Sequence, residues 1–173
     1  SNILQNIPIG GVSSISLWAK WNNITTGDNT IINFESISNT IKLSNHTTNK
    51  SNVNLDFSGN TINTTIQNNT TIQLNKLHHM VLTIGSNTKF YFDGSLIASQ
   101  VTPTELSSAI TRTTHTIGDG ISNNITMAQM TIFNNELTQT NINTLYNLGY
   151  NSRYIDNTYH INTKELQVWV KNN

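Results

Sequence analysis

Short stretches of alternating apolar and polar residues run through most of the chain. They occur at 12–21, 30–34, 40–44, 53–59, 61–67 and 70–75. Successive side chains of a β-strand point to opposite faces, so a period of two predicts strands that are apolar on one face. Clusters of Asn, Gly, Ser and Thr separate these stretches. Short strands at such regular spacing are typical of an all-β sandwich or barrel.

One segment, at 134–150, has a helical period instead. Its apolar residues at helical spacing are Leu137, Ile142, Leu145 and Leu148. Thr138 can accept a hydrogen bond as the N-cap, and Gly149 can end the helix, so the pattern predicts a short helix at 139–148. The chain then ends in a predicted strand at 165–173.

The stretch at 76–85 reads as a strand that carries two adjacent histidines. The period of two places His78 and His79 on opposite faces, so the pair cannot hold one metal ion together. We therefore expect a structural role for both rings. Downstream, Asp93-Gly94 separates two alternating segments and predicts a hairpin with a type I′ turn.

The composition narrows the class of protein. The chain has 173 residues and no break in composition, which predicts a single domain at 1–173. It contains no cysteine, so disulfides and cysteine metal sites are excluded. Only 10% of residues are charged and the net charge is zero, which gives no support for nucleic-acid binding. No apolar run is long enough for membrane insertion.

Several motifs together resemble the laminin G-like and pentraxin-like domains of the concanavalin A-like lectin/glucanase superfamily. They are "SISLWAKW", "LHHMVLTI", "KFYFDGSLI" and the segment that runs from "ITMAQMTIF" to "TLYNLG". The tryptophan that usually opens the histidine strand is missing at 77–78. The resemblance covers a core at 12–149 and leaves 150–173 as an extension with a C-terminal strand. It implies a two-sheet antiparallel jelly-roll sandwich.

The acidic residues give little support for catalysis. Glycoside hydrolysis needs two facing carboxylates, and no two of the nine Asp and Glu residues have the spacing that one strand would require. The Glu-x-Asp-x-Glu strand of the jelly-roll glucanases is absent, and so is a G-x-S-x-G elbow. A carboxylate pair across two strands and a Ser-His-acid triad stay open. We expect a protein that is not an enzyme and has no cofactor.

The resemblance to pentraxins implies where calcium would bind. Pentraxins place acids after an "L-G" that corresponds to "TIGDGISNN", where this chain has Asp119. They place an Asp-Asn pair earlier, where Asn39 matches the asparagine and Ser38 replaces the acid. Because calcium needs several oxygen ligands, we expect weak binding or none at Asn39 and Asp119.

A ligand site needs polar groups and, for a sugar, an aromatic ring. Asp119, Asn123 and Asn124 lie in one predicted loop, and loops at 22–30, 44–52 and 118–124 would form a rim. Trp21 is the candidate for stacking, although large aromatic residues usually belong to the core.

These patterns predict a non-catalytic adhesion module that binds a glycan or a protein receptor. Domains of this resemblance belong to larger extracellular, cell-surface or virion-surface proteins, with other subunits of the assembly as partners. The chain's richness in Asn and Thr suits a virion surface or fibre protein. The alternative is a structural decoration or assembly domain that has no small ligand.

Overall fold

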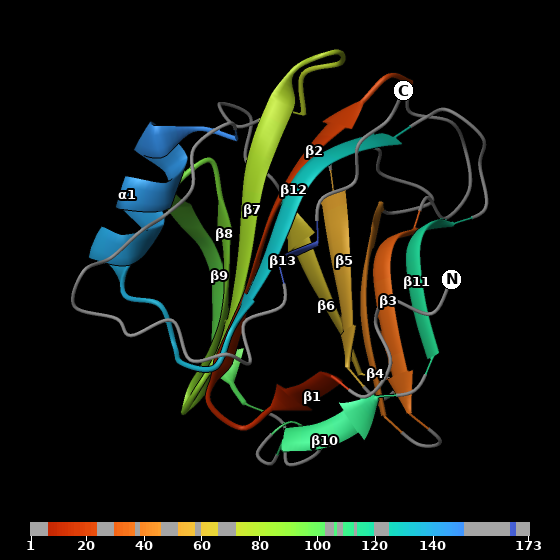
Figure 1. Ribbon diagram of the computed structural model, residues 1–173, viewed down its shortest axis with the longest axis vertical. Helices are drawn as coiled ribbons and strands as arrows, with labels where there is room; N and C mark the ends of the chain where they lie inside the picture. The colour runs from red at the N-terminus through yellow and green to blue at the C-terminus, as the bar shows by residue number, and fades with distance from the viewer. Residues whose placement is uncertain are drawn as a thin grey trace.

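The computed structural model describes most of the chain. The described residues are 7–23, 30–36, 39–45, 52–57, 60–65, 72–102, 106, 109–112, 114–119, 125–150 and 167–168. Two antiparallel sheets face each other, and a single described helix lies against the outside of one of them (Figure 1).

The larger sheet has six strands in the order β13-β12-β2-β7-β8-β9. Their bounds are β2 Ser13–Trp21, β7 Leu77–Ile84, β8 Asn87–Phe92, β9 Ser95–Val101, β12 Ile125–Phe133 and β13 Gln167–Val168. β2 occupies the middle, with β12 on one side and β7 on the other. Residues more than 100 positions apart in sequence therefore become neighbours across β2 and β12.

The facing sheet has five strands in the order β11-β3-β4-β5-β6. Their bounds are β3 Thr30–Ser36, β4 Asn39–Asn45, β5 Asn52–Phe57, β6 Asn60–Thr65 and β11 Thr114–Asp119. A third, two-stranded sheet joins β1 Ile7–Gly10 to β10 Ala109–Arg112 at one end of the sandwich (Figure 1).

The core lies between the two large sheets. Apolar side chains from both sheets line one small interior space: Ile15, Leu17, Met80, Leu82 and Phe90 from one, Ile32 and Leu43 from the other. The alternating pattern therefore places its apolar face inward, as expected for a sandwich. The predicted all-β, two-sheet antiparallel fold with one short helix is confirmed.

Helix α1 spans Gln139–Leu148, as predicted. The Thr138 hydroxyl accepts a hydrogen bond from the Asn141 backbone N–H at 3.2 Å, and the Asn141 side chain accepts one from the Thr138 N–H at 3.1 Å. This reciprocal cap satisfies two of the free N–H groups at the helix start. Gly149 follows at φ 74°, which favours glycine. No described helix is long and apolar enough to span a lipid bilayer.

The turn between β8 and β9 is also the predicted one. Asp93 has φ 48° and Gly94 has φ 81°, so both central residues adopt the positive values of a type I′ turn.

One predicted strand is wrong. Residues 72–75, which are the described part of the stretch at 70–75, form a turn and not a strand. Asn75 has φ 62° and its N–H donates to the Trp21 carbonyl at 2.7 Å. Ile72 is buried while Leu74 is exposed, so the alternation did not reflect one sheet face. Of the predicted strand at 165–173, the structure describes β13 alone.

Candidate functional site

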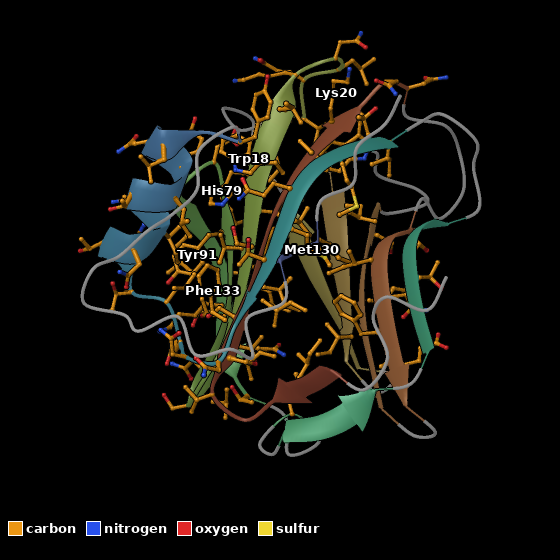
Figure 2. The ribbon with its side chains drawn as sticks, in the orientation of Figure 1. Trp18, Lys20, His79, Tyr91, Met130 and Phe133 are labelled. Carbon is orange, nitrogen blue, oxygen red and sulfur yellow. The ribbon has the colours of Figure 1, made fainter. Side chains whose placement is uncertain are left out.

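The face of the six-stranded sheet that carries α1 is called the outer face here. It receives Ser14, Ser16, Trp18 and Lys20 from β2, because the residues between them point into the core. Figure 2 shows Trp18, His79, Tyr91 and Phe133 in a row on the side of α1. Part of this face is apolar, and Val81, Tyr91, Phe133 and Leu137 pack with Ile142 of the helix.

Four rings form an aromatic cluster on the outer face: Trp18, His79, Tyr146 and Tyr150. Trp18 lies 4.8 Å from His79 and 5.9 Å from Tyr146, and His79 lies 6.2 Å from Tyr146, measured between ring centroids. The three distances are similar and the planes differ by at most 27°, so the rings form a triangle of offset stacks. Tyr150 adds an edge contact to Trp18 at 6.2 Å.

His79 is buried within this cluster. Its Nε2 lies 2.9 Å from the Ser16 hydroxyl, and its Nδ1 has no hydrogen-bond partner among the described residues. Burial lowers the pKa of His79 to about 4, against a smaller opposing effect of the Asp93 charge. The imidazolium would need acceptors for two N–H groups, so the missing Nδ1 partner agrees with this direction.

His78 lies on the opposite face of β7, as predicted, and has a different set of partners. Its ring stacks on Phe92 at 4.7 Å. Asp93 Oδ2 lies 2.8 Å from Nδ1, and the Gln73 backbone N–H donates to Nε2 at 3.1 Å. These partners together fit the tautomer with its hydrogen on Nδ1. Asp93 Oδ1 also accepts the His79 N–H at 2.9 Å, so one carboxylate ties the turn to both histidines.

Ser16, His79 and Asp93 do not form a catalytic triad. The carboxylate of Asp93 binds the ring of His78 and only the backbone of His79. Ser16 and His79 are also buried, so a substrate has no access to the hydroxyl. A nucleophilic serine needs both the oriented base and an open approach, and this arrangement supplies neither.

Each of the three acidic side chains that the structure describes is bound to another group. Asp93 binds His78, and Glu136 forms an ion pair with Lys89 at 2.7 Å. Glu35 accepts a hydrogen bond from Asn33. Among the described residues there is also no group of three His, Cys, Asp or Glu side chains that could hold a metal ion.

The structure separates the two residues predicted to share calcium. Asp119 pairs with Thr30 at one end of β3, while Asn39 pairs with Ser36 at the other. Six residues of strand separate these positions, which is roughly 20 Å. One ion cannot take ligands from both Asn39 and Asp119, and weak calcium binding or none at either residue stays a prediction.

The predicted stacking residue is also misplaced. Trp21 is 0% exposed and belongs to the core between the sheets, so its ring cannot stack on a sugar. Asn123 and Asn124 lie outside the described residues. Asp119 is described only as the last backbone position of β11.

The structure reveals a different exposed aromatic position. Tyr150 is 40% exposed, and its ring makes an edge contact with the buried Trp18. Tyr146 lies one helical turn earlier and is partly exposed. Tyr150 lies beyond the end of α1, after Gly149, so helical spacing in the sequence could not have placed its ring.

Polar side chains lie beside Trp18 on the outer face. Trp18 pairs with Gln129 and Lys20 pairs with Thr126 across β2 and β12, so all four side chains lie on the same face. The Asn22 amide donates to the Thr126 hydroxyl at 3.1 Å. We call the set Lys20, Asn22, Thr126, Gln129, Tyr146 and Tyr150 the Tyr150 surface. It combines an aromatic ring with amide, hydroxyl and ammonium groups.

Comparison with known proteins agrees with this architecture. The family model of the concanavalin A-like lectin/glucanases superfamily matches residues 4–143. A search of curated proteins finds no significant match.

Solved structures with a similar fold include receptor-binding domains of botulinum neurotoxins. The binding domain of serotype D has a TM-score of 0.61 at 22% identity, covering 85% of this chain and 38% of that one. The binding domain of neurotoxin DC, in complex with rat synaptotagmin II, has a TM-score of 0.61 at 22% identity, covering 79% and 35%. The chain thus spans less than two fifths of these structures, and identities this low show a shared fold alone.

Proposed function

Because this chain belongs to the concanavalin A-like lectin/glucanase superfamily, we propose that it is a non-catalytic module that binds a glycan or a protein receptor. The observation that carries the proposal is the Tyr150 surface. A half-exposed tyrosine contacts the buried Trp18, and hydrogen-bonding side chains lie beside Trp18 on the same face of the sheet.

The chemistry of this surface suits a sugar. A tyrosine ring offers an apolar face for the C–H groups of a pyranose, and its hydroxyl remains available to water or ligand. Gln129, Thr126 and Asn22 supply donors and acceptors, and Lys20 supplies a cation. The ring is anchored in advance by Trp18, so little side-chain entropy is lost when a ligand binds.

The position of the surface adds support. Asn22 directly follows β2, and Thr126 lies at the start of β12, where the predicted loops at 22–30 and 118–124 begin and end. Asn22 and Thr126 therefore lie next to these loops in the sequence. The similar binding domain of neurotoxin DC forms a complex with a protein, rat synaptotagmin II, so a protein ligand is the other class to test.

We place this module in a larger surface assembly, either at a cell surface or on a virion. This proposal rests on the family and on the composition, which is rich in Asn and Thr and poor in charge. A purely structural assembly domain is the second candidate, and the exposed apolar side chains Leu96 and Val101 favour it.

Replacing Tyr150 with alanine is expected to weaken glycan binding about tenfold, since a well-placed aromatic contact contributes roughly 1–2 kcal/mol. The measurement is a glycan-array screen of the wild-type chain, followed by titration of the best ligand. Tyr150→Phe keeps the ring and is expected to retain most of the affinity. Val12→Ala, just before the start of β2, controls for an unspecific loss of exposed apolar surface.

Two failures can be told apart. If the folded wild-type chain binds no glycan, the binding function proposed for sugars fails and the assembly role gains support. If the wild-type chain binds but Tyr150→Ala binds equally well, the function stands and the site is elsewhere. Repeating the screen with a calcium chelator tests the metal separately, and we expect no change.

A further inference from the structure

Helix α1 covers part of the outer face through few contacts (Figure 1). Among the described residues, no backbone hydrogen bond joins the helix to the sheet beneath it. Its sequence, QTNINTLYNL, contains no charged residue, so it has no ion pair to hold it. Of its side chains only Ile142 is buried. The helix therefore depends on the small apolar cluster around Ile142 and on the rings beneath Tyr146.

The two ends of the helix are held differently. At the start, the Ser14 hydroxyl donates to the Asn135 carbonyl at 2.8 Å and accepts the Leu137 N–H at 2.9 Å. At the other end, Gly149 has a φ of 74°, and a Cβ atom built on it would meet no atom within 4 Å. The start is thus fixed to β2, while the end lies in open surroundings. This is the geometry of a cover that is hinged near Leu137.

His79 lies beneath the second half of this cover, next to Trp18 (Figure 2). It is 1% exposed. One ring nitrogen meets the Ser16 hydroxyl, and Nδ1 has no partner among the described residues. A neutral ring needs only one donor, but an imidazolium has two, and the second would be buried without an acceptor. Moving the helix away lets water reach that donor.

The groups around His79 do not supply the missing acceptor. Both oxygens of Asp93 already accept hydrogen bonds, from the His78 ring and from the His79 backbone. The Asp93 charge raises the pKa of His79 less than burial lowers it, so the pKa is about 4. The other titratable groups on the surrounding elements are Lys20 of β2, Lys89 and Tyr91 of β8, Glu136 before α1, Tyr146 within it and Tyr150 after it, and β12 has none.

We propose that α1 is an acid-opened cover: protonation of His79 releases the helix from the six-stranded sheet about a hinge at Leu137, while the sandwich stays folded. Three observations carry this proposal: the buried ring without a second acceptor, the uncharged helix above it, and the hydrogen bonds of Ser14 that hold the helix start. In the open state water surrounds the ring, so His79 regains its ordinary pKa of 6.5. The open state then binds the proton more tightly, and acid shifts the population toward it.

The opening would take apart the aromatic part of the Tyr150 surface. Tyr146 and Tyr150 lie on the helix and directly after it, whereas Trp18 stays on β2. Acid would therefore release a ligand from this surface, and a bound ligand would hold the cover closed. This consequence rests on the proposed function. The opening itself does not, so it is tested without a ligand, and its failure leaves the binding function untouched.

Hydrogen–deuterium exchange of the wild-type chain at pH 7 and pH 4.5 measures the opening, after correction for the intrinsic rate at each pH. With pKa values of about 4 closed and 6.5 open, the exchange of α1 amides is expected to rise roughly fiftyfold. Amides of β2 and β7 are expected to stay better protected than those of α1 at both pH values. Equal protection would show that the helix opens only when the whole chain unfolds, which would overturn the proposal.

Two variants assign the effect to a residue. His79→Gln does not titrate, so its α1 amides are expected to change by less than about threefold between the two pH values. Glu136→Gln removes the carboxylate that pairs with Lys89 beside the hinge but keeps His79, and the full rise is expected to remain. Circular dichroism melts check that each variant folds. A rise that persists in His79→Gln, or one that disappears in Glu136→Gln, contradicts the proposal.

Discussion

Replacing Asp93 with alanine is expected to lower the free energy of unfolding by roughly 4 kcal/mol. The carboxylate accepts hydrogen bonds from the ring of His78 and the backbone N–H of His79, both within a buried strand. Each donor left without a partner costs about 1–3 kcal/mol. Alanine also tolerates the φ of 48° less well than Asp. Urea unfolding of the two chains at pH 7 measures the difference.

Asp93→Asn is the matched control. Asparagine tolerates a positive φ, and its carbonyl oxygen can still accept the His79 N–H. The ring of His78 can move its hydrogen to Nε2, where the Gln73 carbonyl lies at 3.4 Å, and accept the asparagine amide at Nδ1. The Gln73 backbone N–H then loses its acceptor at Nε2. We expect a loss of only about 1 kcal/mol. If alanine and asparagine destabilise the fold equally, the two hydrogen bonds do not stabilise the turn as argued.

Lowering the pH from 7 to 4.5 is expected to remove about 2 kcal/mol of stability through His79 alone. Its pKa is about 4 in the folded chain and 6.5 in the unfolded one. Between these values the unfolded chain binds more protons, so acid favours unfolding. The contribution of His79 to the free energy of unfolding is complete above pH 6.5 and is lost as the pH falls to 4. In full it amounts to about 3 kcal/mol, at 1.36 kcal/mol per pKa unit.

The measurement compares wild-type and His79→Gln chains by urea unfolding at both pH values. Glutamine does not titrate and can keep a hydrogen bond to the Ser16 hydroxyl. The carboxylates titrate in both chains, so the difference between the two losses isolates His79. We expect the variant to be less stable at pH 7 but to lose about 2 kcal/mol less on acidification. An equal loss in both chains would show that His79 is charged in the folded state.

Much of the local structure could be predicted because it depends on neighbouring residues. The Asp93-Gly94 turn needs two residues that accept positive φ, and that chemistry is visible in the sequence. The cap of α1 needs Thr138 three residues before Asn141. Alternation also separated His78 from His79, because a strand has only two faces. At 72–75 the same rule failed, since a left-handed Asn75 turned the chain where the pattern continued.

The sequence by itself determined the strand periodicity, the hairpin turn, the helix bounds and the opposite faces of the two histidines. Only the tertiary structure decided which aromatic ring reaches solvent and which polar residues meet. Trp18 and Trp21 both lie in β2, but the first is covered by α1 and the second by the facing sheet. Tyr150 contacts Trp18, which lies beside Gln129 because β2 pairs with β12, over 100 residues away in the sequence. Strand register places Asn39 and Asp119 at opposite ends of β3. These positions depend on pairing between strands that are far apart in the sequence. A local pattern of apolar and polar residues does not show which strands pair.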